Sequence, residues 1–291
     1  MHRYLTTKEV ADLLRLKERK VYDLAASGDI PCTRATGKLL FPRDGVDAWL
    51  SSNTDAGAVV SQRPNVFLGS HDPLLDWALL ESRCGIATFF DGSQDGLERF
   101  SARQGIATGL HLFDAASGEW NVPSISARLG LASCVLVEWA WRRRGLIVSK
   151  EHAAEIRSVA DLKGRRVVPR QPEAGSQVLL EHVMAENDLA KDAVEFTATA
   201  RSETDAAAAV LEGKADAAFG LEALAAKYRL EFVPIANERY DLLVDRRAWF
   251  EPPMQTLLEF CRSKTFLERA ADYTGYDISG LGKVHFNGQS A

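Results

Sequence analysis

Cysteine is scarce in this sequence, and its four copies lie far apart. Cys32, Cys84, Cys134 and Cys261 form no CxxC pair, so neither a disulfide framework nor a zinc site is expected. No apolar run approaches the roughly 18 residues that a membrane span requires. Residues 1–9 are polar and charged and lack the apolar core of an export signal. These absences predict a cytoplasmic protein with reduced thiols and no membrane contact.

Motifs of nucleotide binding and of catalysis are missing as well. The chain has no glycine-rich dinucleotide fingerprint, no phosphate-binding P-loop, no GxSxG turn and no HExxH helix. No pair of carboxylates stands out for acid–base chemistry. We therefore expect a protein that is not an enzyme and that carries neither a cofactor nor a metal ion.

Charge is unevenly distributed along the 291 residues. Residues 1–53 carry nine Lys and Arg against seven Asp and Glu, whereas residues 54–291 carry 26 against 33. The overall composition, 46% hydrophobic and 26% charged, is typical of globular proteins, and the length allows two or three domains. A small basic end on a larger acidic body indicates that the two parts meet different partners.

The first fifty residues have the pattern of short helices and a basic wing. Thr6 and Glu9 form a capping box, after which Val10, Leu13 and Leu14 fall on one face of a helix.

A second helix is expected next, and a wing follows it. This helix covers residues 17–26 and ends at Gly28. Short strands at 30–33 and 39–41 surround a glycine turn and form the wing, and Pro42 opens a last helix.

This stretch resembles the winged helix-turn-helix of the excisionase and MerR-like families. The matching segments are residues 4–14, 21–22, 28–31 and 41–43. The resemblance implies that the second helix enters the major groove of double-stranded DNA and that the wing touches the backbone. The residues expected to contact DNA are Lys17, Glu18, Arg19, Lys20, Tyr22, Arg34 and Lys38. A protein–protein module with a solvated charged face is the alternative.

We place this DNA-binding domain at residues 1–52 and a polar linker at 53–63. From residue 64 to residue 291, strand and helix patterns alternate. Strands are expected at 66–69, 85–90, 106–113, 165–169, 194–199 and 215–219, and helices at 73–82, 94–102, 176–186, 204–212 and 221–228. This alternation predicts an α/β fold with two lobes. Extended segments at 134–149 and 239–245 would join the lobes.

The larger part is similar to type 2 periplasmic binding proteins. It is especially similar to a cytoplasmic branch that is fused to DNA-binding domains and related to molybdate- and tungstate-binding proteins. The matching segments are residues 69–75, 90–97, 111–114, 118–123, 175–176, 212–220, 230–235 and 238–242. The resemblance implies a two-lobe domain that closes over a small ligand.

Hydroxyl side chains stand at three predicted strand-to-helix junctions. Ser70 follows the first strand, Ser93 the second, and Gly175 and Ser176 open a helix of the second lobe. Helix N-termini and neutral donors suit an oxyanion, although each serine could equally be an ordinary helix cap.

Charged and titratable side chains near these junctions are further candidates. His71 and Arg170 are expected at the ligand, while Asp72 is expected to cap a helix, because a bare carboxylate there would repel an anion. His111 belongs to the matched pattern but could merely brace a loop. The run at 142–144, three arginines, has the appearance of a solvated turn.

The sequence thus predicts a one-component transcriptional regulator. Its N-terminal domain would bind DNA as part of a homodimer, because one small module offers few specific contacts, and its C-terminal domain would sense molybdate, tungstate or a similar oxyanion. The alternatives are the same architecture with a small organic ligand or a molybdenum-cofactor precursor, an excisionase-like DNA-architectural protein, and an enzyme built on the binding-protein fold.

Overall fold

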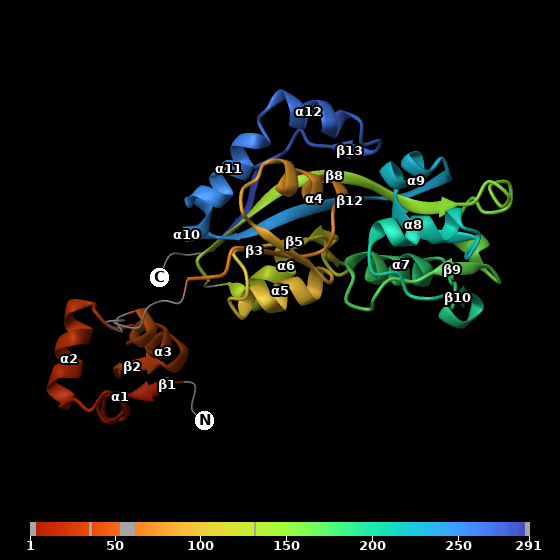
Figure 1. The fold of residues 1–291 in the computed structure, drawn as a ribbon. Coiled ribbons are helices and arrows are strands. Elements are labelled where there is room, and N and C mark those ends of the chain that lie inside the picture. Colours follow the sequence, from red (N-terminus) through yellow and green to blue (C-terminus); the bar gives the residue numbers. More distant parts are fainter. Residues whose placement is uncertain (1–3, 35–36, 53–61, 131, 289–291) are drawn as a thin grey trace. The chain divides into compact units, whose positions relative to one another are not determined.

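The structure is a computed structural model that describes residues 4–34, 37–52, 62–130 and 132–288. Contacts within the chain divide it into two units, Met1–Gln62 and Arg63–Ala291 (Figure 1). All but the last two residues of the predicted linker lie outside the described residues.

The small unit combines three helices with a two-stranded sheet. Its elements are β1 (Tyr4–Thr6), α1 (Thr7–Leu14), α2 (Glu18–Ser27), β2 (Leu40–Pro42) and α3 (Arg43–Ser52). The capping box is confirmed: the Glu9 amide donates to Thr6 Oγ1 at 3.3 Å, and the Thr6 amide donates to the Glu9 carboxylate at 2.7 Å. Helix α2 ends at Gly28, which has a φ of 78°.

Two expectations for this unit were wrong in detail. Leu13 is 44% exposed, because the buried face of the short helix α1 runs along Thr7, Val10 and Ala11. The expected first wing strand is reduced to a single bridge between Thr33 and Leu40. Strand β2 instead pairs with β1, which buries the apolar side of both strands.

The large unit is built on one ten-stranded sheet (Figure 1). The strand order is β10-β9-β11-β8-β12-β5-β3-β4, and β13 and β14 also pair with β8. The strands of the first lobe are β3 (Val66–Gly69), β4 (Ala87–Phe90) and β5 (Ala107–Leu110), which are parallel, and those of the second are β9 (Arg166–Val168), β10 (Glu195–Phe196) and β11 (Ala217–Leu221). Two long antiparallel strands, β8 (Cys134–Val148) and β12 (Glu231–Asp245), pass through both lobes. The expected α/β fold with two lobes is confirmed.

Helices flank this sheet in both lobes. The first lobe has α4 (Pro73–Glu81), α5 (Ser93–Ser101), α6 (Val122–Leu129), α10 (Arg246–Trp249), α11 (Pro252–Phe260) and α12 (Lys264–Ala271). The second lobe has α7 (Gly175–Glu186), α8 (Glu203–Leu211), α9 (Glu222–Tyr228) and the 3₁₀ turns η1 (Val159–Leu162) and η2 (Lys191–Ala193). The remaining strands are β6 (Phe113–Asp114), β7 (Glu119–Trp120), β13 (Tyr276–Asp277) and β14 (Val284–Asn287).

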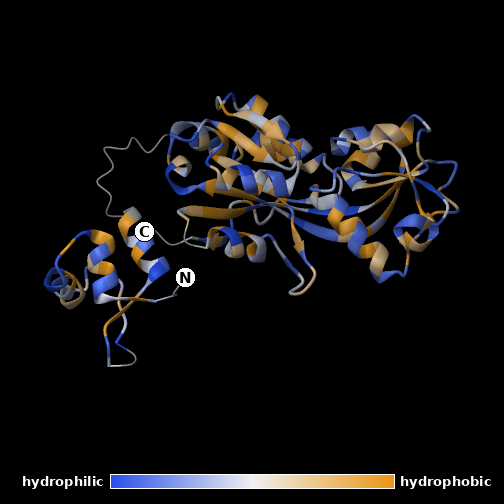
Figure 2. Ribbon diagram, turned by 90° about the horizontal axis from the view of Figure 1, so that it is seen from below, coloured by the Kyte–Doolittle hydropathy of each residue, from blue (hydrophilic) through white to orange (hydrophobic). Residues whose placement is uncertain are grey.

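Each lobe has its own apolar core. The first is centred on Phe67, Trp139 and Phe266, and the second on Leu146, Val167 and neighbours from α7. Figure 2 shows apolar residues along the strands, with hydrophilic residues on many loops and helix segments. No helix among the described residues is both long and apolar enough to cross a lipid bilayer.

Candidate ligand site and DNA-binding surface

Each of the three hydroxyl-bearing junctions follows the carboxyl end of a strand. Two lie in the first lobe, after the parallel strands β3 and β4, and one lies in the second lobe, after β9. Ser70 follows β3, and Asp72 then caps α4 by accepting from the Leu75 amide at 2.8 Å. Ser93 is the first residue of α5, directly after Gly92. Gly175 and Ser176 open α7, after β9. The carboxyl ends of parallel strands are where ligands bind in open α/β sheets.

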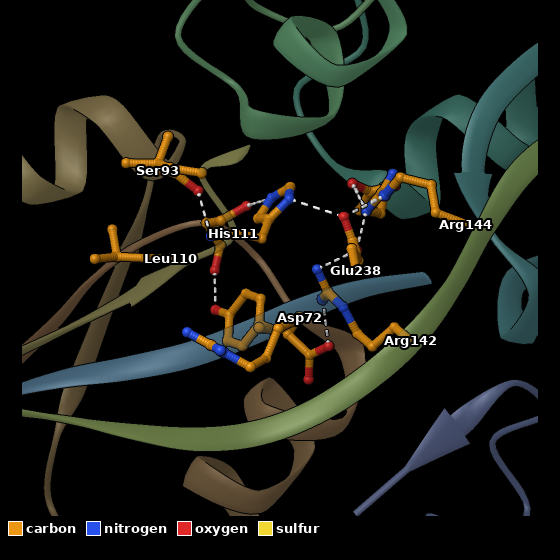
Figure 3. A network of polar contacts seen from close by, with 12 residues as sticks. Asp72, Ser93, Leu110, His111, Arg142, Arg144 and Glu238 are labelled. Atoms are coloured by element: carbon orange, nitrogen blue, oxygen red, sulfur yellow. Dashed lines mark hydrogen bonds and ion pairs between the residues drawn. The ribbon is translucent and has the colours of Figure 1, made fainter. Parts of the chain in front are cut away.

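All three junctions meet at His111, which is 1% exposed. Its ring Nε2 lies 2.8 Å from Ser70 Oγ, and its amide donates to Ser93 Oγ at 3.2 Å (Figure 3). Gly175 packs directly on it, since a Cβ there would come within 2.6 Å of the His111 carbonyl oxygen. The structure therefore brings Ser70, Ser93 and Gly175 together around a residue that the sequence left as a possible brace.

The two lobes touch each other beside this cluster. The Gln94 amide donates to the Glu173 carbonyl at 3.3 Å, and Gln171 Nε2 donates to the Asp91 carboxylate at 3.4 Å. Gly92 has a φ of 107°, and a Cβ on it would lie 3.1 Å from the Glu173 carbonyl. The described arrangement is thus a closed one, with the serines covered by the opposite lobe.

The Ser176 hydroxyl has no hydrogen-bond partner among the described residues, although the residue is only 2% exposed. The helix that it opens also lacks a side-chain cap at Ala174. A buried hydroxyl without a partner is costly. This hydroxyl and the helix N-terminus beside it form a donor pair that a ligand could satisfy.

Arg170 and His71 are placed differently from the serines. Arg170 is 6% exposed and donates to the Ala200 and Arg201 carbonyls at 3.0 Å, and it pairs with Glu203 at 3.2 Å. Burial lowers its pKa, against the charge of Glu203. His71 is half-buried, with its ring edge against Phe90. Both remain predictions as ligand contacts, and no described hydrogen bond joins either to Ser70, Ser93 or Ser176.

A buried chain of charges crosses the molecule beneath His111. Arg142 donates to Asp72 at 2.7 Å and to Glu238 at 2.5 Å (Figure 3). Arg144 binds Glu238 at 2.6 Å and Glu203 at 2.9 Å. With Arg170, the chain comprises three guanidinium groups and three carboxylates, and it links the first lobe to the second through β8 and β12. Its charges balance, so Asp72 does not present a bare negative charge to an anion.

The buried chain of charges shows that the expectation of a solvated turn at 142–144 was wrong. The three arginines lie within strand β8, where side chains alternate between faces. Arg142 and Arg144 are 1% and 0% exposed, while Arg143 faces solvent with 49% of its side chain exposed. The signal that could have revealed this pair was the position of three consecutive arginines inside a long extended segment, because the first and third then share one face of a strand.

The guanidinium groups favour the ionised form of two carboxylates in this buried chain of charges, Glu238 and Glu203. Burial raises the pKa of Glu238, but Arg142 and Arg144 outweigh it and hold that pKa well below its usual range. The pKa of Glu203 is lowered to about 2, because Arg144 and Arg170 overcome the effect of burial. The pKa of His111 is lowered, chiefly by burial, although Glu238 opposes the shift.

Ser70, His111 and Glu238 form a serine–histidine–carboxylate series that sequence reasoning missed. His111 Nδ1 lies 3.0 Å from Glu238 Oε2, and Nε2 lies 2.8 Å from Ser70 Oγ. The same order of atoms occurs in hydrolytic triads. This geometry is a candidate acid–base arrangement, whereas the sequence displayed no pair of carboxylates for such chemistry; that the protein is not an enzyme stays a prediction.

An open groove of about 960 Å³ runs along the lobe boundary beside the serines. Its lining includes four carboxylates, Asp91, Asp95, Glu98 and Glu173, and a single guanidinium, Arg128. The excess of carboxylates in its lining means that this groove does not favour an anion.

On the small unit, the residues expected to contact DNA are exposed, and three of them line one groove. Lys17 to Lys20 are exposed at the start of α2, and Tyr22 is 52% exposed. A groove of about 530 Å³ brings Tyr22 together with Arg34 and Lys38, and it also includes Lys8, which sequence reasoning missed. Tyr22 of helix α2 thus lies beside three basic residues, Lys8, Arg34 and Lys38.

Two lobes joined by two long strands define a ligand-binding fold, and a helix-turn-helix precedes it. Residues 78–262, more than half of the chain, match the PBP superfamily domain, and the chain belongs to this superfamily. Residues 4–54 match the helix-turn-helix domain family.

Two curated proteins and a solved structure are similar to this chain. The chain is 25% identical over 300 residues to Uncharacterized protein YvgK of Bacillus subtilis, with 96% of each chain covered. A second relative, from Clostridium pasteurianum, is described as a protein in the ferredoxin 2Fe-2S gene 5′ region; it is 30% identical over 79 residues, which cover 27% of this chain and 70% of that protein. Among solved structures, a phosphate ABC transporter substrate-binding protein with bound phosphate from Clostridium perfringens has a TM-score of 0.51 at 10% identity, over 72% of this chain and 97% of that one.

Proposed function

We propose that this protein is a one-component transcriptional regulator in which a small anion, such as molybdate or tungstate, is sensed between the two lobes. The observation that carries the proposal is the convergence of Ser70, Ser93 and the N-terminus of α7 on His111, with the Ser176 hydroxyl left without a partner. Small neutral donors at helix N-termini bind tetrahedral oxyanions without adding charge.

The surroundings of this site are consistent with an anion. The carboxylates nearest to His111 are already compensated by guanidinium groups. An added oxyanion would therefore not face a bare carboxylate at His111 and would be held by dipoles and hydroxyls. Binding to DNA would place the protein in the cytoplasm, and a homodimer would supply two helix-turn-helix units to one operator.

The experiment is a thermal unfolding series on the full chain with molybdate, tungstate, sulfate and phosphate. A ligand at 100 times its Kd stabilises a protein by about 2.7 kcal/mol, so the Tm should rise with the bound anion. Ser176→Ala should abolish the rise, whereas the control Ser126→Ala, on the exposed side of α6, should retain it. A Tm that responds to no oxyanion but does respond to an organic compound would favour an organic ligand instead.

A hydrolase is the second candidate, because of the Ser70–His111–Glu238 series. We propose a binding role for these residues, since Ser70 is 3% and Glu238 0% exposed and Glu238 is shared by two guanidinium groups. A fluorophosphonate reagent, which labels nucleophilic serines, should leave Ser70 unmodified. Labelling of Ser70 that is lost in His111→Gln would establish an enzyme.

A further inference from the structure

The hydrogen positions around His111 follow from its two partners. Glu238 is an ionised carboxylate and has no proton to donate. The hydrogen between His111 Nδ1 and Glu238 Oε2, 3.0 Å apart, therefore belongs to Nδ1. Nδ1 of His111 is thus the donor in its hydrogen bond to Glu238.

The other ring nitrogen decides what Ser70 offers to a ligand. Burial lowers the pKa of His111, so the ring is neutral and Nε2 carries a lone pair. Across the 2.8 Å contact, the Ser70 hydroxyl must donate to Nε2. The hydroxyl hydrogen of Ser70 is then engaged with Nε2, and only lone pairs of Oγ remain for any further partner. In this state Ser70 repels an anion.

We propose that binding of an oxyanion at Ser70 is coupled to the uptake of one proton by His111 at Nε2. The proton comes from hydronium or the buffer acid in solvent, whose bond to the proton breaks as the new N–H forms; no other covalent bond changes. Nε2–H then donates to Ser70 Oγ, and the Ser70 hydrogen turns to the anion. This inference rests on the proposed function, because it assumes that the ligand is an oxyanion at this site.

The groups around His111 make both protonation states accessible. From β12, Glu238 favours the charged ring, and the Tyr240 ring stacks on it with centroids 5.9 Å apart. From β8, Arg142 and Arg144 oppose the charge, as does burial. Helices α5 and α7 contribute Ser93 and Gly175, which carry no charge. A bound anion adds the negative charge that tips this balance towards the protonated ring.

Proton uptake determines the direction in which the affinity for the anion changes with pH. The pKa of His111 lies below its ordinary value of about 6.5 in the empty site and rises when the anion binds. Anion affinity should therefore increase as the pH falls from the bound-state pKa to the empty-state pKa. Within this window one linked proton changes the affinity by about tenfold per pH unit. Above the window the affinity should be low and constant.

The test is isothermal titration of the full chain with molybdate from about pH 6 to about pH 8.5, in pairs of buffers with different ionisation enthalpies. We expect the affinity for molybdate to increase as the pH falls. The measured binding enthalpy should depend on the ionisation enthalpy of the buffer, and its slope should correspond to close to one proton taken up per anion. Binding with a pH-independent affinity and the same heat in both buffers would overturn the inference and leave the proposed function intact. No binding of molybdate or tungstate at any pH would overturn the proposed function and the inference with it.

A substitution at His111 tests whether this residue takes up the proton that is linked to anion binding. His111→Gln places an amide donor near the position of Nε2, so Ser70 can donate to the anion at every pH; its affinity should be independent of pH and its heat independent of buffer. His182→Gln, on the half-exposed side of α7, is the matched control and should keep the wild-type dependence. Proton uptake that persists in His111→Gln would assign the proton to another group and contradict the proposal. The wild-type titration decides the coupling even if this variant does not fold.

Discussion

Arg144 shows how much a single side chain in this protein depends on its partners. Its guanidinium is fully buried and binds both oxygens of Glu238, at 2.6 and 2.8 Å, and both oxygens of Glu203, at 2.9 and 3.3 Å. A buried ion pair adds little net stability compared with apolar residues, but the loss of one partner leaves a buried charge uncompensated.

We predict that Arg144→Met destabilises the large unit by about 3–5 kcal/mol. Arg143→Met is the control, because the guanidinium of Arg143 is half exposed and pairs only with Glu222 among the described ion pairs. This substitution should lower the free energy of unfolding by about 1 kcal/mol or less. Urea unfolding of both variants measures the difference. Equal effects would contradict the buried chain of charges.

The depressed pKa of Glu203 predicts a loss of stability in acid. A carboxyl group whose pKa is lower in the folded state stabilises the fold above its unfolded value, about 4.3, and this contribution disappears as the pH falls through the folded value, about 2. Glu203→Gln should therefore be least stable relative to wild type near neutral pH. The gap, on the order of 3 kcal/mol, should shrink from about pH 5 downwards.

Unfolding midpoints in urea at several pH values between neutral and acid measure this gap. The exposed carboxylate of Glu212 provides the control: Glu212→Gln should differ little from wild type at every pH. A gap for Glu203→Gln that stays constant with pH would show that its carboxylate is not stabilised by the guanidinium groups.

At the scale of elements, the alternation of strands and helices was predictable because each lobe repeats a local pattern. Val66–Gly69 and Pro73–Glu81 were both expected within a residue of their bounds. The helices at Pro252–Phe260 and Lys264–Ala271 were not predicted, although a proline at the start of the first is a typical helix signal. Their place in the first lobe depends on packing against Trp77 and Trp139, which the sequence does not display.

The candidate site was predictable only in part, for the same reason. Ser70, Ser93 and Gly175 were singled out because strand ends are local features. The partners of His111 and Arg144 were missed because they lie 127 and 94 positions away, on Glu238. The antiparallel pairing of β12 with β5 brings Glu238 close to His111, and the pairing of β12 with β8 brings Glu238 close to Arg144.

Helix α2 and the segment before β2 carry the prediction for DNA. Arg19→Ala and Lys38→Ala should each weaken binding to double-stranded DNA, because both side chains are exposed and neither is part of the core. If Lys38 meets only a phosphate, its loss should weaken all sequences alike and lower the salt slope by about one unit.

Fluorescence anisotropy at several salt concentrations measures both effects. Lys264→Ala, whose side chain is 87% exposed on the large unit, is the matched control and should bind DNA like wild type. Unchanged affinity in both Arg19→Ala and Lys38→Ala would contradict docking through the helix and the wing.

At the scale of the whole molecule, regulation requires the two units to influence each other. Ligand and DNA then change each other's affinity by the same factor, because the coupling free energy is reciprocal. Ser70→Ala combined with Ser176→Ala should abolish the effect of the anion on DNA binding. DNA affinity without ligand should stay nearly unchanged, since the small unit is a separate unit of contacts.

The most direct test of a ligand-sensing regulator is the affinity of the full chain for molybdate, measured with and without saturating DNA. The DNA is a double-stranded fragment selected for tight binding from a random pool. We predict that the two affinities differ by about 5- to 150-fold, the range of coupling free energies of about 1–3 kcal/mol. Equal molybdate affinities with and without DNA would contradict the account.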